Sequence, residues 1–127
     1  MHPYIITLES HFSEFWRYNL IVQGEVMHRG THSADVEYSS IVAPVGSNLK
    51  TPPTTYQRGE TIVIETLKGD ALGLYIYILP HTLPFSQRVA DSQPFEFRVE
   101  IHQGKESIFK HRYEVDQWSG CNVEITL

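Results

Sequence analysis

The chain has 127 residues, of which 41% are hydrophobic and 20% charged, values typical of a globular protein. A domain of this length buries roughly two-thirds of its unfolded surface, so we predict a single domain over residues 1–127 that needs no disulfide or metal to fold. The formal net charge of −5 includes only 10 Lys and Arg residues. Because no basic stripe is present to neutralise phosphates, we expect no nucleic-acid partner.

Cysteine usage and apolar runs limit the class further. Cys121 is the only cysteine, which excludes an intrachain disulfide and a thiolate zinc cluster built from this chain alone. The N-terminal residues lack a basic region and a signal-like apolar stretch, and no run is long enough for a membrane span. Localisation stays unknown: the chain reads as soluble and cytoplasmic as given, and as exported if Met1 replaced a signal peptide.

The first half of the chain predicts four strands. Apolar and polar residues alternate over residues 4–9 and again over 18–27, where Gly24 indicates a bulge or bend. Residues 36–42 form a third strand, and residues 61–67 form a fourth after a turn at 58–60. The prolines of residues 43–57 exclude a central strand between them, because proline removes a hydrogen-bond donor from the sheet.

The second half predicts four more strands. Residues 72–79 are the most apolar run, and Pro80 ends it. A second proline-rich connection, residues 80–94, leads to the clearest alternation, over 95–102. The turn at 103–105 predicts that residues 106–115 return antiparallel, and residues 122–127 form the last strand. No window has helical spacing over a helix length, so we expect no helix longer than about two turns, with residues 16–20 as the weakest point of that expectation.

Short strands with turn signals every ~8–12 residues predict an all-β fold, a two-sheet antiparallel β-sandwich of about eight strands. Immunoglobulin-like, C2-like and jelly-roll topologies all satisfy this pattern. The two core cysteines around a tryptophan that mark antibody-type domains are absent.

The densest group of metal-ligand side chains contains His28, His32 and Asp35. Imidazole nitrogens and a carboxylate are ordinary zinc ligands, but this spacing is not diagnostic, and Gly30 indicates a solvated hairpin loop. The chain also lacks an Asp-x-Asp pair, an EF-hand loop, a Gly-x-Ser-x-Gly elbow and a cysteine-protease signature. We therefore predict no metal, no cofactor and no catalytic residue, with His28, His32 and Asp35 as the candidates if a metal binds.

Aromatic side chains next to polar groups suit recognition of proteins or glycans, because they give a large rigid contact area. The strand at 72–79 is apolar on both faces, so we predict a central strand whose tyrosine face is covered by the proline-rich connections or by a second copy of the chain. The candidate binding residues are Tyr38, Tyr56, Tyr75, Tyr77 and Trp118.

The leading functional hypothesis is a non-catalytic β-sandwich module that binds a protein partner or a glycan. Two long irregular connections, 43–57 and 80–94, support it, because loops of that length are often functional. The first alternative is a small metal-dependent or histidine-based hydrolase that uses His28, His32 and Asp35. The second is a structural or assembly subunit that pairs through an exposed strand edge, and a homo-oligomer is one such assembly.

Overall fold

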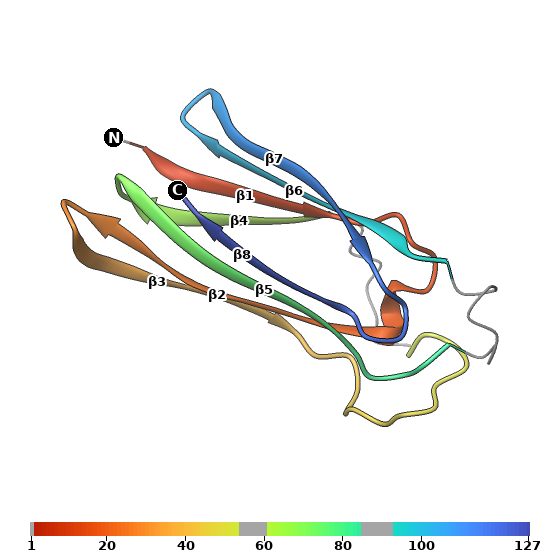
Figure 1. Ribbon diagram of the computed structural model, residues 1–127. Coiled ribbons are helices and arrows are strands. Elements are labelled where there is room, and N and C mark those ends of the chain that lie inside the picture. Colours follow the sequence, from red (N-terminus) through yellow and green to blue (C-terminus); the bar gives the residue numbers. More distant parts are fainter. Residues whose placement is uncertain (1, 54–60, 85–92) are drawn as a thin grey trace.

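The computed structural model describes residues 2–53, 61–84 and 93–127. Figure 1 shows two layers of strands lying face to face. Sheet A has the strand order β4-β1-β6-β7, and sheet B has the order β3-β2-β5-β8. Sheet A contains β1 (Pro3–Glu9), β4 (Thr61–Lys68), β6 (Phe95–Gln103) and β7 (Glu106–Val115). Sheet B contains β2 (Tyr18–His28), β3 (Thr31–Ser40), β5 (Ala71–Pro80) and β8 (Cys121–Thr126).

Every strand pair is antiparallel, which confirms the predicted two-sheet sandwich of eight strands for the described residues. The core lies between the sheets because successive side chains of a strand point to opposite faces. In β1, Tyr4, Ile6 and Leu8 are buried, whereas Ile5 and Thr7 are partly exposed. The same alternation runs through the central strands β2, β5 and β6.

Strand β5 lies between β2 and β8, which confirms its predicted central position. The described helical structure is one short 3₁₀ turn, η1 (Phe15–Arg17), which overlaps residues 16–20, where the no-helix expectation was weakest. The described residues include no helix with the length and apolar character needed to span a membrane.

The stretch from His28 to Asp35 forms the expected exposed polar hairpin, but its loop is only the two residues Arg29 and Gly30, and the rest belongs to strands. Arg29 and Gly30 both have positive φ, 51° and 76°, as a two-residue type I′ turn requires. Strand β3 therefore begins at Thr31, five residues before the expected start. Its polar residues are tolerated because β3 is an edge strand with an exposed outer side.

Gly24 does not mark a bulge, contrary to expectation. It pairs in regular register with Val36 and Leu74, and the irregularity in β2 lies between Val26 and Met27. A Cβ atom at position 24 would overlap the carbonyl oxygen of Gly73 on the neighbouring strand. Glycine is therefore required at position 24 by the close approach of β5.

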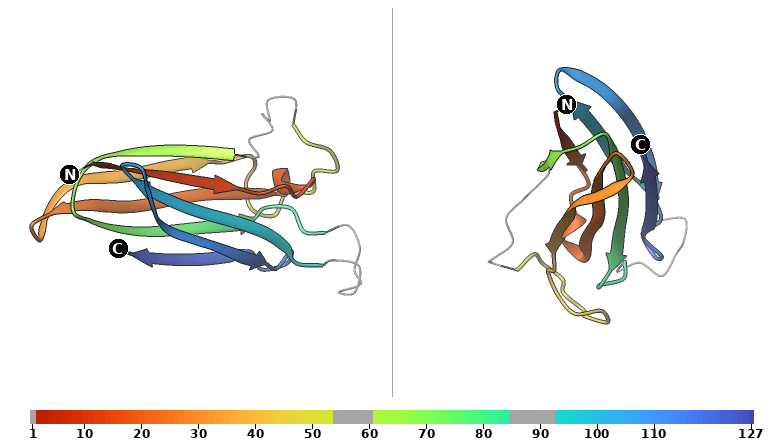
Figure 2. Two further views of the ribbon diagram at one scale, coloured as in Figure 1. Left: turned by 90° about the horizontal axis from the view of Figure 1, so that it is seen from above. Right: turned by 90° about the vertical axis from the view of Figure 1, so that its left-hand side faces the viewer.

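The described parts of the two long connections meet at one end of the sandwich, as Figure 2 shows. Residues 41–53 follow β3, and residues 81–84 follow β5. They are joined there, because the amide of Gly46 donates to the carbonyl of His81 at 3.1 Å. The 3₁₀ turn η1 lies at the same end, which we call the loop end.

Candidate functional site

A buried arginine organises the loop end. Arg17 has no exposed surface, although arginine is almost never fully buried without partners. Its Nη2 donates to Oε1 of Gln117 at 2.6 Å, and its Nη1 donates to the carbonyl of Thr82 at 3.4 Å. Glu14 supplies a carboxylate 3.5 Å from Nη2 and is itself 40% exposed, while Arg17 Nε has no hydrogen-bond partner among the described residues. The charge of Arg17 is therefore only partly compensated.

The connections are joined by a second polar group, at His81. Its Nε2 lies 2.7 Å from the carbonyl oxygen of Trp16, and a carbonyl can only accept, so Nε2 carries the proton. Burial, together with the nearby charge of Arg17, lowers the pKa of His81. The ring is therefore neutral near pH 7, and its Nδ1 accepts.

Two hydroxyls compete for Nδ1 of His81. The hydroxyl of Thr82 lies at 2.7 Å and that of Ser47 at 3.0 Å, and the two hydroxyl oxygens are also in short contact with each other. Because Nδ1 has one lone pair, the nearer Thr82 donates to it, and Ser47 donates to Thr82 or to the carbonyl of His81 at 3.3 Å. The group thus fixes the two connections together and does not place Ser47 as an activated nucleophile.

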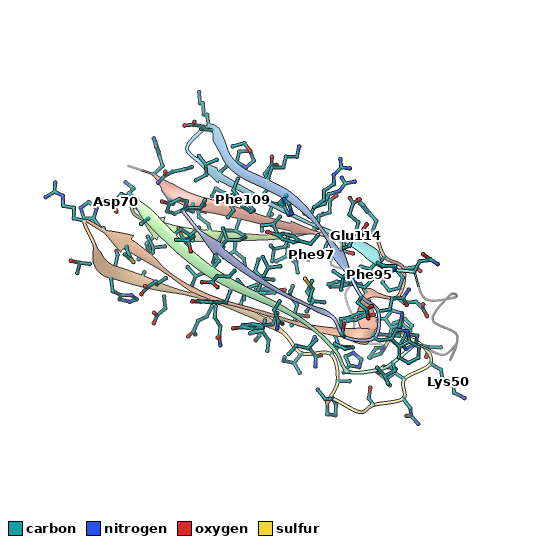
Figure 3. The ribbon with its side chains drawn as sticks, viewed as in Figure 1. Lys50, Asp70, Phe95, Phe97, Phe109 and Glu114 are labelled. Carbon is teal, nitrogen blue, oxygen red and sulfur yellow. The ribbon has the colours of Figure 1, made fainter. Side chains whose placement is uncertain are left out.

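A pocket of about 400 Å³ opens beside this group. Residues of the first connection and residues 80–83 of the second line it. Val45 and Leu83 are large apolar residues that are 77% and 53% exposed there. Figure 3 places Lys50, another lining residue, at this end of the molecule, opposite to Asp70. The pocket therefore combines an apolar rim, a polar floor and one cation.

The outer side of sheet B is a second candidate site, and it carries two of the predicted aromatic residues. Tyr75 is 45% exposed and Tyr77 is partly exposed, on the side of β5 that faces away from the core. Tyr75 lies between Gln23 of β2 and Glu124 of β8. The described parts of the proline-rich connections leave Tyr75 in solvent, so they are not the cover predicted for this ring.

On this outer side of sheet B, the Asp and Glu side chains are not matched by any Lys or Arg of the same four strands. Neither Glu37 nor Glu124 forms an ion pair within the described residues. We call this surface the acidic tyrosine face; it consists of Tyr75 and Tyr77 with the exposed carboxylates Glu25, Asp35, Glu37 and Glu124.

The candidate metal ligands are directed to different partners. His28 Nδ1 lies 3.6 Å from a carboxylate oxygen of Asp70, whereas His32 pairs with Glu25 at 2.9 Å and with Asp35 at 3.4 Å. In residues 2–53, 61–84 and 93–127, no group of three or more histidine, cysteine and acidic side chains is arranged to hold a metal ion. His32 thus contacts acids of its own hairpin, whereas His28 contacts an acid of the turn between β4 and β5.

The remaining aromatic candidates do not join Tyr75 and Tyr77. Tyr38 packs against the core from β3, because it faces inward opposite Val22. Trp118 lies in the turn between β7 and β8, where its amide binds the Asp116 carboxylate at 2.8 Å. Tyr56 lies outside the described residues.

Most residues of the loop end carry no recognisable signal in the sequence. Ser47, Lys50 and His81 lie in the two proline-rich connections, but no motif marks them. Arg17 had a weak signal, since a charged residue directly before a long apolar strand needs a partner to be buried. Those partners come from residues about 65 and 100 positions away, which local patterns do not reveal.

Comparisons with known proteins give a fold and no family. No protein-family model matches the chain, and no curated protein matches it. The chain is similar to the crystal structure of a DUF4425 family protein from Bacteroides ovatus, with a TM-score of 0.51 and 7% sequence identity. The match covers 99% of this chain and 92% of the other. At this identity the likeness concerns the fold alone.

Proposed function

We propose that the protein is a non-catalytic interaction module that recognises a protein partner through the acidic tyrosine face. The observation that carries this proposal is the exposure of Tyr75, 45%, on a central strand. Tyrosine rings bury a large area on binding at a low entropic cost, because they have few rotatable bonds. A ring of this size left in solvent at the middle of a sheet is a feature typical of interaction surfaces.

The charges favour a partner that presents lysine or arginine. Glu124 pairs directly with Tyr75 across the strands, and Glu37 lies in the same row beyond Gln23. A cation over a tyrosine face gains about 0.5–2 kcal/mol, and carboxylates beside it add attraction. Unpaired acids also steer a basic partner toward the surface and speed its association.

The other partner classes have less support from this surface. Two copies that met through this face would bring Glu37 and Glu124 toward like charges, which costs free energy. Glycan stacking would use the tyrosines but would not require an excess of carboxylates. Edge pairing would use β3, β4, β7 or β8 and would leave Tyr75 exposed.

The test uses two labelled peptides of equal length and apolar content, (Arg-Ser-Leu)₃ and (Glu-Ser-Leu)₃, titrated with the protein in fluorescence anisotropy. We expect the basic peptide to bind at least about tenfold more tightly, and its affinity to fall when ionic strength rises from roughly 0.05 to 0.5 M. Tyr75→Ser combined with Tyr77→Ser should remove most of this binding, because the ring area is lost.

The matched control is Val63→Ser combined with Leu67→Ser, which removes two side chains that are 62% and 65% exposed on β4 of sheet A. This variant should bind the basic peptide as the native chain does. Equal binding of both peptides would contradict the proposal. Glycan-array binding that the tyrosine variant loses would replace the protein partner by a glycan, and a dimer that only this variant dissociates would replace it by a second copy.

A further inference from the structure

The pocket at the loop end has features that folding alone does not explain. Val45 and Leu83 expose large apolar side chains around one cavity of about 400 Å³, where Pro80 adds further apolar surface. Ligand pockets of about 300–1,000 Å³ typically combine apolar walls with a few polar groups that fix orientation. Here the polar groups are provided by the floor, formed by Ser47, His81 and Thr82.

Two polar side chains that line the pocket have no hydrogen-bond partner among the described residues. The side chains of Asn48 and Lys50 line it, and neither forms a hydrogen bond or ion pair with the described residues. The floor hydroxyls, in contrast, are occupied with one another and with His81. An incoming ligand would therefore meet the ammonium group of Lys50, which can only donate, and the side-chain amide of Asn48, whose nitrogen can donate as well.

The described lining residues contribute a positive charge to the pocket, although the chain has a net charge of −5. Lys50 is the charged residue among the described lining residues, which include no carboxylate. Behind the floor, the buried guanidinium of Arg17 donates to the carbonyl of Thr82, and the exposed Glu14 compensates it only partly. The neutral His81 adds no charge of its own.

We propose that this pocket binds an amphipathic carboxylate, with the apolar part against Val45 and Leu83 and the carboxylate at Lys50 and Asn48. A cation beside apolar walls selects such a ligand over a neutral or cationic one of the same length. Two sources offer this chemistry, namely a free medium-chain acid and the carboxyl terminus of a peptide that ends in an apolar residue. The site is separate from the acidic tyrosine face and does not depend on its function.

The experiment titrates the full chain with octanoate, octanol and octylammonium in isothermal calorimetry. Octanoate should bind at least about tenfold more tightly than octanol, a difference of ~1.4 kcal/mol, and octylammonium should bind more weakly than both. A second pair of probes, acetyl-Ala-Ala-Leu with a free carboxylate and the same peptide as an amide, separates the two sources. The source whose carboxylate form binds more tightly is the one the pocket prefers.

Two variants assign the site. Lys50→Met should reduce octanoate affinity to that of octanol and leave octanol unchanged, while Leu83→Ser should weaken both. The control Lys110→Met removes an exposed lysine of β7 and should change neither. Equal affinity for octanoate and octanol, no effect of Lys50→Met, or no octanoate binding up to roughly 10 mM would overturn the proposal. Because Lys50 and Leu83 are exposed, both variants should fold, and their urea midpoints verify this.

Discussion

The outer faces of the two sheets differ in how their charges are matched. On sheet A, Arg98 contacts Glu96 on its own strand and lies 3.7 Å from Glu9 on β1, and Arg112 of β7 lies 3.9 Å from Glu96. On sheet B, the strands carry carboxylates and tyrosines without any lysine or arginine. Each face belongs to a four-stranded antiparallel sheet, so the difference does not come from architecture.

The solvent-facing side of a sheet can compensate its own charges, or it can leave them uncompensated for a partner of the opposite charge. On sheet A, Arg98 and Arg112 lie within ion-pair distance of Glu9 and Glu96, so these charges compensate one another within the face. The carboxylates of Glu37 and Glu124 on sheet B have no such neighbours, and Tyr75 lies in the same row. The cost of leaving charges unmatched is small in water, but it gives specificity when a partner supplies the opposite sign.

At the loop end, Arg17 joins the start of β2 to the turn after β7. We expect Arg17→Met to produce the largest effect on stability, a loss of about 3 kcal/mol. The side-chain oxygen of Gln117 and the carbonyl of Thr82 would be left buried without a donor, at ~1–3 kcal/mol each, and relief of the buried charge offsets part of this. Urea unfolding monitored by circular dichroism measures the loss.

The matched substitution on sheet A is Arg98→Met, which removes an exposed arginine that also contacts carboxylates. Surface ion pairs contribute little, so its effect should be much smaller than that of Arg17→Met. Equal losses in the two variants would show that Arg17 does not hold the sheets together.

Charge reversal on sheet B tests its proposed selectivity. Glu37→Lys combined with Glu124→Lys should lower affinity for the basic peptide by at least about tenfold, ~1.4 kcal/mol, because attraction becomes repulsion. The same variant should bind the acidic peptide more tightly than the native chain does. Glu106→Lys combined with Glu114→Lys, on β7 of sheet A, is the control. A similar loss in the control would indicate a response to net charge alone.

Supplying the missing cation should make sheet B resemble sheet A. Gln23 lies between Glu37 and Tyr75, so Gln23→Lys places an ammonium group opposite an unpaired carboxylate. A cross-strand pair of this kind stabilises a sheet by roughly 0.2–1 kcal/mol. The thermal midpoint should rise while binding of the basic peptide weakens. Gln23→Met, which has a similar length and no charge, should do neither, and a rise in both variants would exclude the electrostatic explanation.

The fold was largely predictable because strand alternation is local. The inward positions of β1 and β6, such as Tyr4 and Phe97, follow from a period of two, and the structure confirms them as buried. The start of β3 and the role of Gly24 were predicted wrongly, because both depend on backbone geometry that the residue types do not reveal. Positive φ at Arg29 and Gly30 lets β3 begin at Thr31. Glycine is needed at position 24 because the backbone of Gly73, about 50 residues away, lies too close for a side chain.

The candidate sites were predictable only in part. Tyr75 and Tyr77 were predictable, because a strand apolar on both sides is visible in the sequence, and their role in binding stays a prediction. Lys50 and His81 were not predictable, since the pocket forms where two separate connections converge. The absence of lysine and arginine from the strands of sheet B was also hidden, because β2, β3, β5 and β8 become neighbours only once the strand order is known.

The smallest predicted effect concerns pH and sheet A. The hydrogen bond from Arg98, followed by the charges of Arg98 and Arg112, holds the pKa of Glu96 below its ordinary value of 4.5. Its ion pairs therefore stabilise the fold above pH 4.5, and this contribution is lost as the pH falls through the lowered pKa. Urea unfolding should show Glu96→Gln less stable than the native chain at pH 7 and equal to it at strongly acidic pH. Glu124→Gln on sheet B, where no cation faces the carboxylate, should cost no stability at pH 7; a loss there as large as that of Glu96→Gln would mean that the two faces are electrostatically alike.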